Sequence, residues 1–171
     1  MDEVLIKSRY VRDAVVLKEF YRHYFFTRPL MICLHVLYAL VFAECVVLCT
    51  LGSPVAIGGC IFLAFMMGMH VLSYHRTVKI VLAREAEVSG GTMELEMVMT
   101  DTCIRSTTAN GTTEVGYDKI KDVSQTKNLI LIRTNAKLIY ILPKDSFEIG
   151  NKETLFSLCE EKGIRVKGKK K

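Results

Sequence analysis

The sequence lacks the short motifs that mark common enzyme classes. No serine lies in a Gly-x-Ser-x-Gly elbow, no Gly-x-x-x-x-Gly-Lys-Ser/Thr loop is present to bind phosphate, and no His-Glu-x-x-His pair could hold zinc. The six cysteines include no Cys-x-x-Cys pair, so we expect reduced thiols, no metal and no other cofactor. We therefore expect a protein that is not an enzyme.

Net positive charge is confined to the C-terminal tail. The formal net charge is +5 at pH 7, but residues 162–171 hold six basic groups and no acidic group, which leaves a net charge of −1 (5 minus 6) elsewhere. A basic side chain near an anionic leaflet gains up to about 1 kcal/mol, so the tail could contact lipid headgroups. A disordered, solubilising tail is an equal alternative. Because no aromatic residues interleave with the lysines, we expect no nucleic-acid binding.

Two apolar runs dominate the first half of the chain. In residues 30–51 only His35 and Glu44 are strongly polar, and in residues 54–72 only His70 is. Runs of roughly 20 apolar residues match the hydrocarbon thickness of a bilayer, about 30 Å. The short linker between them contains glycine, serine and proline, and it can do little more than reverse the chain. The sequence thus predicts a transmembrane helical hairpin.

Basic residues flank both runs. Arg22 and Arg28 precede the first run, and Arg76, Lys79 and Arg84 follow the second. The positive-inside rule then places both termini in the cytoplasm of a multi-pass inner-membrane protein. A cleaved signal peptide is the rival interpretation, but the first run begins late and a second follows it at once.

The polar residues inside the runs are candidate functional residues. If residues 52 and 53 form the tip of the hairpin, His35 lies opposite His70, and two interfacial histidines are favoured over a paired proton or metal site. A charged carboxylate near mid-span costs several kcal/mol, so we expect Glu44 to carry its proton. Its hydrogen bond could go to its own helix backbone, to another copy of the hairpin or to a different membrane protein.

Small residues recur at four-residue spacing in the second run. They are Ala56, Cys60, Ala64 and Gly68, and such a seam lets another helix approach closely. We expect this seam to pack against a helix and Glu44 to bond across the interface.

The segment before the first run mixes aromatic and charged residues. Phe20 and Tyr24, and also Tyr21 and Phe25, have i,i+4 spacing. Aromatic side chains favour the headgroup boundary, so we expect an interfacial helix that anchors the chain and runs into the span near Pro29.

The apolar period changes to two beyond Gly91. Alternating stretches separated by turns, including the Asn110-Gly111 pair, predict a small antiparallel sheet. Asn151 is a suitable N-cap for a closing amphipathic helix that carries Leu155. Short strands followed by such a helix predict an α+β domain, a pleckstrin-homology-like antiparallel half-barrel capped by its C-terminal helix.

Lysines on this domain are candidate contacts for acidic headgroups or a partner, although a solvated rim is the commoner role of charges beside strands. These lysines are Lys119, Lys121, Lys144, Lys167, Lys169, Lys170 and Lys171.

Three local patterns carry a family resemblance. An aromatic-x-x-Ile stretch lies at 117–120, a hydrophobic hairpin at 129–142 and a Pro-Lys-x-x-Phe element at 143–147. With the short helix that follows, they resemble the YcxB-like bacterial membrane proteins. The resemblance implies an N-terminal strand, two membrane helices and a C-terminal pleckstrin-homology-like domain, so that residues 4–8 pair with the later sheet.

We therefore expect a bacterial inner-membrane protein with a cytoplasmic binding module that is regulatory or scaffolding and contacts lipid, itself or a membrane-protein partner. A small transporter or channel component with Glu44 and the two histidines as a proton path is one alternative, and a toxin or bacteriocin immunity protein is another. The expected segments are the N-terminal strand and interfacial helix (1–29), the hairpin (30–74), its cytoplasmic extension (75–90), the pleckstrin-homology-like domain (91–165) and the basic tail (166–171).

Overall fold

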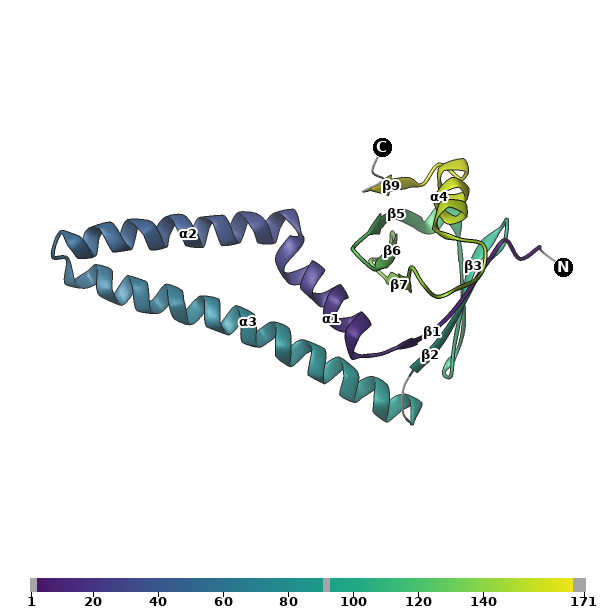
Figure 1. Ribbon diagram of the computed structural model, residues 1–171, viewed down its shortest axis with the longest axis horizontal. Coiled ribbons are helices and arrows are strands. Elements are labelled where there is room, and N and C mark those ends of the chain that lie inside the picture. Colours follow the sequence, from purple (N-terminus) through teal and green to yellow (C-terminus); the bar gives the residue numbers. More distant parts are fainter. Residues whose placement is uncertain (1–2, 91–92, 168–171) are drawn as a thin grey trace. The chain divides into compact units, whose positions relative to one another are not determined.

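The structure, a computed structural model, describes residues 3–90 and 93–167 (Figure 1). The chain divides into two compact units. The hairpin unit is Tyr21–Val81, and the sheet unit combines Met1–Phe20 with Leu82–Lys171. The two stretches of the sheet unit therefore flank the hairpin unit in sequence.

The hairpin unit contains two apolar helices joined by a tight turn. α2 (Pro29–Thr50) and α3 (Pro54–Ser89) each begin at a proline, which needs no hydrogen-bonded N–H in the first helical turn. Gly52 in the turn has a φ of 83°, a left-handed conformation that favours glycine. Both helices are long and apolar enough to cross a membrane, and the 22 residues of α2 extend about 33 Å. The prediction of two long apolar helices is confirmed.

The segment before α2 is helical but interrupted. α1 (Ala14–Arg22) follows Asp13, whose Oδ1 accepts hydrogen bonds from the N–H groups of Val15 and Val16 at 2.9 Å. A π-helical turn, η1 (His23–Thr27), comes next, and one residue of extended backbone then precedes α2. The helix that the sequence predicts to run straight into the span is therefore broken before the span begins.

Phe20 of α1 packs against the sheet unit. With Val16, it contacts a small cluster of Leu129, Leu131 and Ile141. These side chains belong to two neighbouring strands, so α1 covers apolar surface that the sheet would otherwise expose. Phe20 is half-buried in this contact, and the interfacial role of the segment stays a prediction.

The described part of the sheet unit forms two sheets. The first has the strand order β4-β3-β2-β1-β8 and the second has the order β7-β6-β5-β9, with η2 (Tyr117–Lys119) between β4 and β5. Paired strands are antiparallel, except that β9 runs parallel to β5. The strands are β1 (Ile6–Arg12), β2 (Met93–Met99), β3 (Cys103–Thr108), β4 (Gly111–Gly116), β5 (Ile120–Gln125), β6 (Leu129–Thr134), β7 (Ile139–Pro143), β8 (Phe147–Ile149) and β9 (Arg165–Lys167).

β1 precedes the hairpin unit in sequence, and its main partner, β2, follows it. The pairing runs along the whole of β1, from Ile6 opposite Met99 to Arg12 opposite Met93. The expected pairing of the N-terminal segment with the later sheet is therefore confirmed. A fragment that begins after α3 would lack this strand, which lies between β2 and β8 in the first sheet.

The C-terminal helix, α4 (Lys152–Glu161), contributes one side to the core of the sheet unit. Asn151 caps it as expected, because its Oδ1 accepts a hydrogen bond from the Thr154 N–H at 2.8 Å. The apolar face of α4 is buried together with side chains from both sheets. The main members of this core are Leu155, Phe156, Leu158 and Cys159 of α4 with Ile6, Met97, Ile132 and Leu142.

Candidate functional sites

The two histidines of the hairpin unit lie side by side, as predicted from their equal distances in sequence from the hairpin tip. The ring centroids of His35 and His70 are 5.3 Å apart in an edge-to-face arrangement. His35 Nδ1 donates to the carbonyl oxygen of Met31 at 2.5 Å, and His70 Nε2 donates to that of Phe25 at 3.4 Å. Each ring therefore already has a backbone acceptor, which holds the pair in place.

Aromatic side chains from η1 surround this histidine pair. The Phe26 ring centroid lies 5.7 Å from that of His35 and 5.5 Å from that of His70, and Phe25 lies 5.5 Å from His70. Tyr74 of α3 completes the cluster, 5.6 Å from Phe26. Phe25 and Phe26 are consecutive residues of η1, and both rings contact His70. The histidines thus belong to a packed aromatic cluster.

Glu44 lies apart from the histidine pair. Its side chain is exposed on α2, whereas His35 faces α3 through its contact with His70. The structure therefore brings two of the three intramembrane polar residues together and leaves the third on the outer surface of the hairpin unit. A proton path through all three residues is not formed within one hairpin.

The small-residue seam of α3 is divided between two faces. Ala56 is buried and Cys60 is half-buried, whereas Ala64 and Gly68 are exposed, and a Cβ added at Gly68 would meet nothing within 4 Å. A close contact between α2 and α3 lies at Gly59 instead, where an added Cβ would be 2.9 Å from Cys45 Sγ. The sequence gives no reason to prefer Gly59 over its neighbour Gly58, because only the rotation of the helix decides between them.

A group of three cysteines lies beside this close approach. The Cys60 thiol of α3 lies close to the thiols of Cys45 and Cys49 of α2. All six cysteines of the chain are free. The four-residue spacing of Cys45 and Cys49 puts both on one helix face, a signal that sequence reasoning could have used.

The lysines singled out by sequence do not form one site. Lys119 and Lys121 are exposed beside and within β5, whereas Lys144 Nζ donates to the carbonyl oxygens of Thr126 and Lys127 at 2.6 and 3.0 Å. Lys167 binds a carboxylate, described below, and Lys169, Lys170 and Lys171 lie outside the described residues. The lysines at 119, 121, 144 and 167 thus have distinct surroundings.

Asp122 forms a buried acidic centre in β5 that sequence reasoning missed. Its carboxylate accepts hydrogen bonds from Arg133 Nε and Nη2, at 2.7 and 2.5 Å, and from Lys167 Nζ at 3.0 Å. Burial alone raises the pKa of Asp122, but these hydrogen bonds outweigh it, so the pKa lies below its usual value. The interaction attaches β9, and with it the start of the basic tail, to the sheet.

The turn between β5 and β6 is a second polar centre. Glu19 of α1 accepts hydrogen bonds from Thr126 Oγ1 at 2.5 Å and from the Asn128 N–H and Nδ2 at 2.8 Å each. Lys144 binds the same turn from the other side through its two carbonyl contacts. Burial and the nearby Lys152 lower the pKa of Lys144, while Glu19 opposes this shift.

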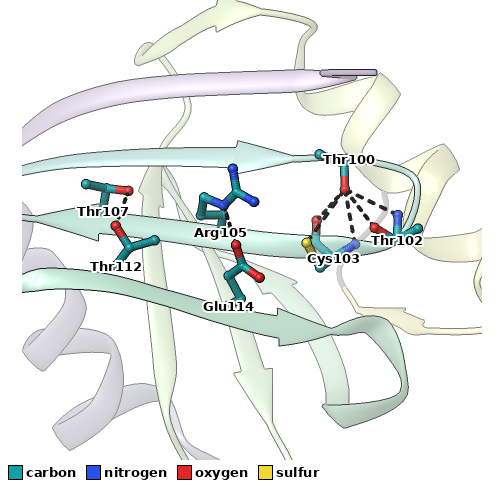
Figure 2. Close-up of polar contacts among 7 residues, drawn as sticks. All are labelled: Thr100, Thr102, Cys103, Arg105, Thr107, Thr112 and Glu114. Atoms are coloured by element: carbon teal, nitrogen blue, oxygen red, sulfur yellow. Dashed lines mark hydrogen bonds and ion pairs between the residues drawn. The ribbon is translucent and has the colours of Figure 1, made fainter. Parts of the chain in front are cut away.

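The polar residues of the β2–β3–β4 region bond to one another (Figure 2). Thr100 Oγ1 accepts from the N–H groups of Thr102 and Cys103 at 3.3 Å each, which closes the β2–β3 turn. Across the neighbouring hairpin, Arg105 Nε donates to Glu114 Oε1 at 2.5 Å. These contacts stabilise the turn and the strand pair.

Metal binding has no candidate site in residues 3–90 and 93–167. No group of three or more His, Cys, Asp or Glu side chains there could hold a metal ion.

Comparison with known proteins identifies one relationship. The family model described as YcxB-like protein matches residues 100–159, which run from the end of β2 almost to the end of α4. No curated protein matches the chain. The two long apolar helices are consistent with the membrane part of such proteins and suggest membrane association. The resemblance predicted from the sequence is thus confirmed, and the chain carries a YcxB-like segment at residues 100–159.

Proposed function

We propose that the chain is an integral protein of the bacterial inner membrane whose sheet unit is a cytoplasmic, non-enzymatic binding module with a regulatory or scaffolding role. The observation that carries this proposal is the continuous pairing of β1 with β2 across the hairpin unit in sequence. A strand before α2 and a strand after α3 can pair only if both lie on the same side of a membrane. Two spans satisfy this condition, and one span does not.

The charges near the ends of the spans favour the cytoplasmic side. Arg22 and Arg28 precede α2, and Arg76 and Lys79 lie in the part of α3 that follows its apolar segment. Such basic flanks stay on the cytoplasmic side. Both termini and the whole sheet unit are then cytoplasmic.

The sheet unit is proposed to have a pleckstrin-homology-like fold. Its two sheets and a helix near the C-terminus support this view, although the short strand β9 follows α4 where the expected order ends on the helix. α4 supports this view because one of its faces contributes four buried side chains to the core between the sheets. Folds of this size place binding sites on their surface, since the interior is filled.

A surface cavity at the start of α4 supports the binding role. It has a volume of about 330 Å³ and is lined by Lys144, Asp145, Phe147, Asn151, Lys152 and Glu153. Burial and, after it, the nearby Lys152 lower the pKa of Lys144, and a bound anion would oppose both effects. Glu153, which pairs with Lys152 at 3.3 Å, would have to release it. The chemistry fits a phosphate headgroup or the carboxylates of an acidic partner.

The membrane arrangement is tested by labelling with a membrane-impermeant maleimide in intact cells. A Ser53→Cys chain should gain labelling over the parent chain, because this residue lies at the turn between the spans. An Asn110→Cys chain should gain it only after the cells are permeabilised. Labelling of Asn110→Cys in intact cells would contradict the proposed topology.

The binding role is tested on the full chain in nanodiscs of neutral lipid. We expect a short-chain phosphatidylglycerol or an acidic peptide to slow hydrogen exchange at residues 144–154, and the more effective of the two identifies the source of the anion. Lys152→Gln should abolish the effect, and Lys121→Gln, which changes an exposed lysine of β5, should not. Equal responses of the parent and Lys152→Gln chains would exclude this cavity as the binding site.

A further inference from the structure

Most side chains of α2 are exposed, and six of them on the face opposite His35 and Cys45 can be aligned with the positions of a helix pair. Spacings of three and four residues alternate along it, as in the a and d positions of a left-handed coiled coil. Every member is exposed, while the side chains that contact α3, such as His35 and Cys45, lie on another face. The members of this outer stripe are Leu30, Cys33, Leu37, Leu40, Glu44 and Val47.

Glu44 distinguishes this stripe from the other apolar surface of the hairpin unit. It follows the start of α2 by 15 residues, or about 22 Å, which places it well inside the span. An ionisable side chain that faces hydrocarbon without a partner costs several kcal/mol. Within the described part of the chain, no hydrogen-bond or ion-pair partner reaches its carboxyl group. A partner from outside this hairpin would supply the missing hydrogen bond.

We propose that two copies of this chain pair in the membrane along the outer stripe of α2, with their Glu44 carboxyl groups hydrogen-bonded to each other. The inference rests on the proposed function, because it requires α2 to span the bilayer. It adds an interface and a partner to that function.

A second copy fits this surface because the interaction is self-complementary. A two-fold axis along the membrane normal places each residue at the same depth as its own counterpart. Carboxyl groups that carry their protons are both donors and acceptors, so two of them can exchange a pair of hydrogen bonds. A single polar residue at an a position is also known to fix register in paired helices, and Glu44 holds that position here. No cation from another protein is needed.

Cys33 provides a direct reporter of this arrangement. Two copies with the same topology have parallel α2 helices, so Cys33 of one copy lies beside Cys33 of the other. Residues at such positions come within the Cα separation of about 4.4 to 6.8 Å that a disulfide requires. Cys33 is exposed, whereas Cys45, Cys49 and Cys60 are half-buried between α2 and α3.

The experiment uses the purified full chain reconstituted in bilayers and oxidised with copper phenanthroline and oxygen. Two thiols then lose two protons and two electrons to form one disulfide, with oxygen as the acceptor. We expect a covalent dimer from the parent chain and from Cys103→Ser, and none from Cys33→Ser. A parent chain that stays monomeric under these conditions overturns the proposed pairing.

The role of Glu44 is tested by the equilibrium between monomer and dimer in the same bilayers. Glu44→Gln keeps a side chain that both donates and accepts, so the dimer should persist. Glu44→Leu should weaken dimerisation about 3- to 30-fold, the range expected for interhelical hydrogen bonds. The matched control is Gly68→Leu, which enlarges an exposed position of α3 and should leave dimerisation unchanged. Equal dimerisation of the parent and Glu44→Leu chains would exclude the carboxyl pair.

The labelling of Ser53→Cys separates this inference from the proposed function. If that labelling succeeds and cross-linking through Cys33 fails, the hairpin spans the membrane and only the pairing is wrong. If that labelling fails, the spanning arrangement itself is wrong. Loss of dimerisation in Gly68→Leu would move the interface to α3 and overturn the assignment to α2.

Discussion

The two units of the molecule place similar apolar side chains in opposite surroundings. In α2 of the hairpin unit, Leu40 is 63% exposed, whereas Leu142 of β7 in the sheet unit is 0% exposed. The sheet unit buries its leucines and isoleucines between two sheets and a helix. Removal of these apolar side chains from water therefore favours its folding. The exposed leucines of α2 are favourable only where lipid replaces water. The same residue type is therefore buried in the sheet unit and exposed in the hairpin unit, as suits a helix that associates with a membrane.

Two acidic residues, one in each unit, also differ in their surroundings. Asp122 in the sheet unit is 3% exposed and receives hydrogen bonds from Arg133 and Lys167. Glu44 in the hairpin unit is exposed and lies among apolar neighbours. A folded domain that buries a carboxylate supplies its partners from its own strands. A two-helix hairpin has fewer neighbours to supply such partners, and Glu44 is left exposed.

The largest expected effect comes from exchanging one core leucine for alanine in each unit. Leu142→Ala should lower the free energy of unfolding of the sheet unit by about 2 to 5 kcal/mol, because it leaves a cavity in a fully packed core. Leu40→Ala should leave that quantity unchanged, since its side chain is exposed. Native-state hydrogen exchange of sheet amides in mild detergent measures both. Equal losses in the two variants would show that the units do not differ as described.

A smaller effect is expected for Asp122→Asn. This change should lower the free energy of unfolding of the sheet unit by about 3 kcal/mol at pH 7, because it leaves two cations beside a neutral group. The lowered pKa of Asp122 also sets the direction of the pH dependence. This contribution to stability is present above the usual pKa of an aspartate, about 3.9, and is lost as the pH falls through the lower pKa of the folded state.

The difference between the parent and Asp122→Asn chains should therefore be constant from pH 7 to about 5 and should shrink at lower pH. Unfolding midpoints measured at several pH values provide the test. Glu114→Gln, which changes an exposed ion pair with Arg105, should have little effect at any of them. A difference that grows as the pH falls would contradict the assigned interaction.

The smallest expected effect concerns the packing of the hairpin. Gly59→Leu should separate α2 from α3, because even a Cβ there would be 2.9 Å from Cys45 Sγ. Overpacking of this kind costs about 1 to 3 kcal/mol. Gly68→Leu should cost less, since nothing lies within 4 Å of the added Cβ. Cross-linking between paired cysteines introduced at positions 41 and 63 reports the separation, and equal cross-linking in both variants would exclude the close approach at Gly59.

The hairpin was predictable because its signals are local. Two long apolar runs predict two long helices. A hairpin tip at residues 52 and 53 then places His35 at the same depth as His70, and the two rings are indeed in contact. The rotation of each helix was not predictable, because an almost uniformly apolar sequence has no periodic polar face. For this reason the predicted seam at Ala56, Cys60, Ala64 and Gly68 is divided between two faces, and the close contact lies at Gly59.

For the sheet unit, the sequence predicts the secondary-structure elements better than the contacts between them. Alternation of apolar residues predicts strands, and Asn151 predicts the start of α4. Nothing local marks Asp122 as buried, because its partners, Arg133 and Lys167, are 11 and 45 residues away in sequence. The contact of Phe20 with the sheet was not predictable for the same reason: its partners lie more than a hundred residues further along the chain.

By itself, the sequence determined the element types, the two apolar helices and the resemblance over residues 100–159, because these depend on residue order within short windows. The tertiary structure decided which faces of those elements meet. It joined β1 to β2 across the hairpin, paired Asp122 with cations from β6 and β9, and left Glu44 on the outer face of α2. These outcomes depend on contacts between residues far apart in sequence, and their free energies are gained only when the whole chain has folded.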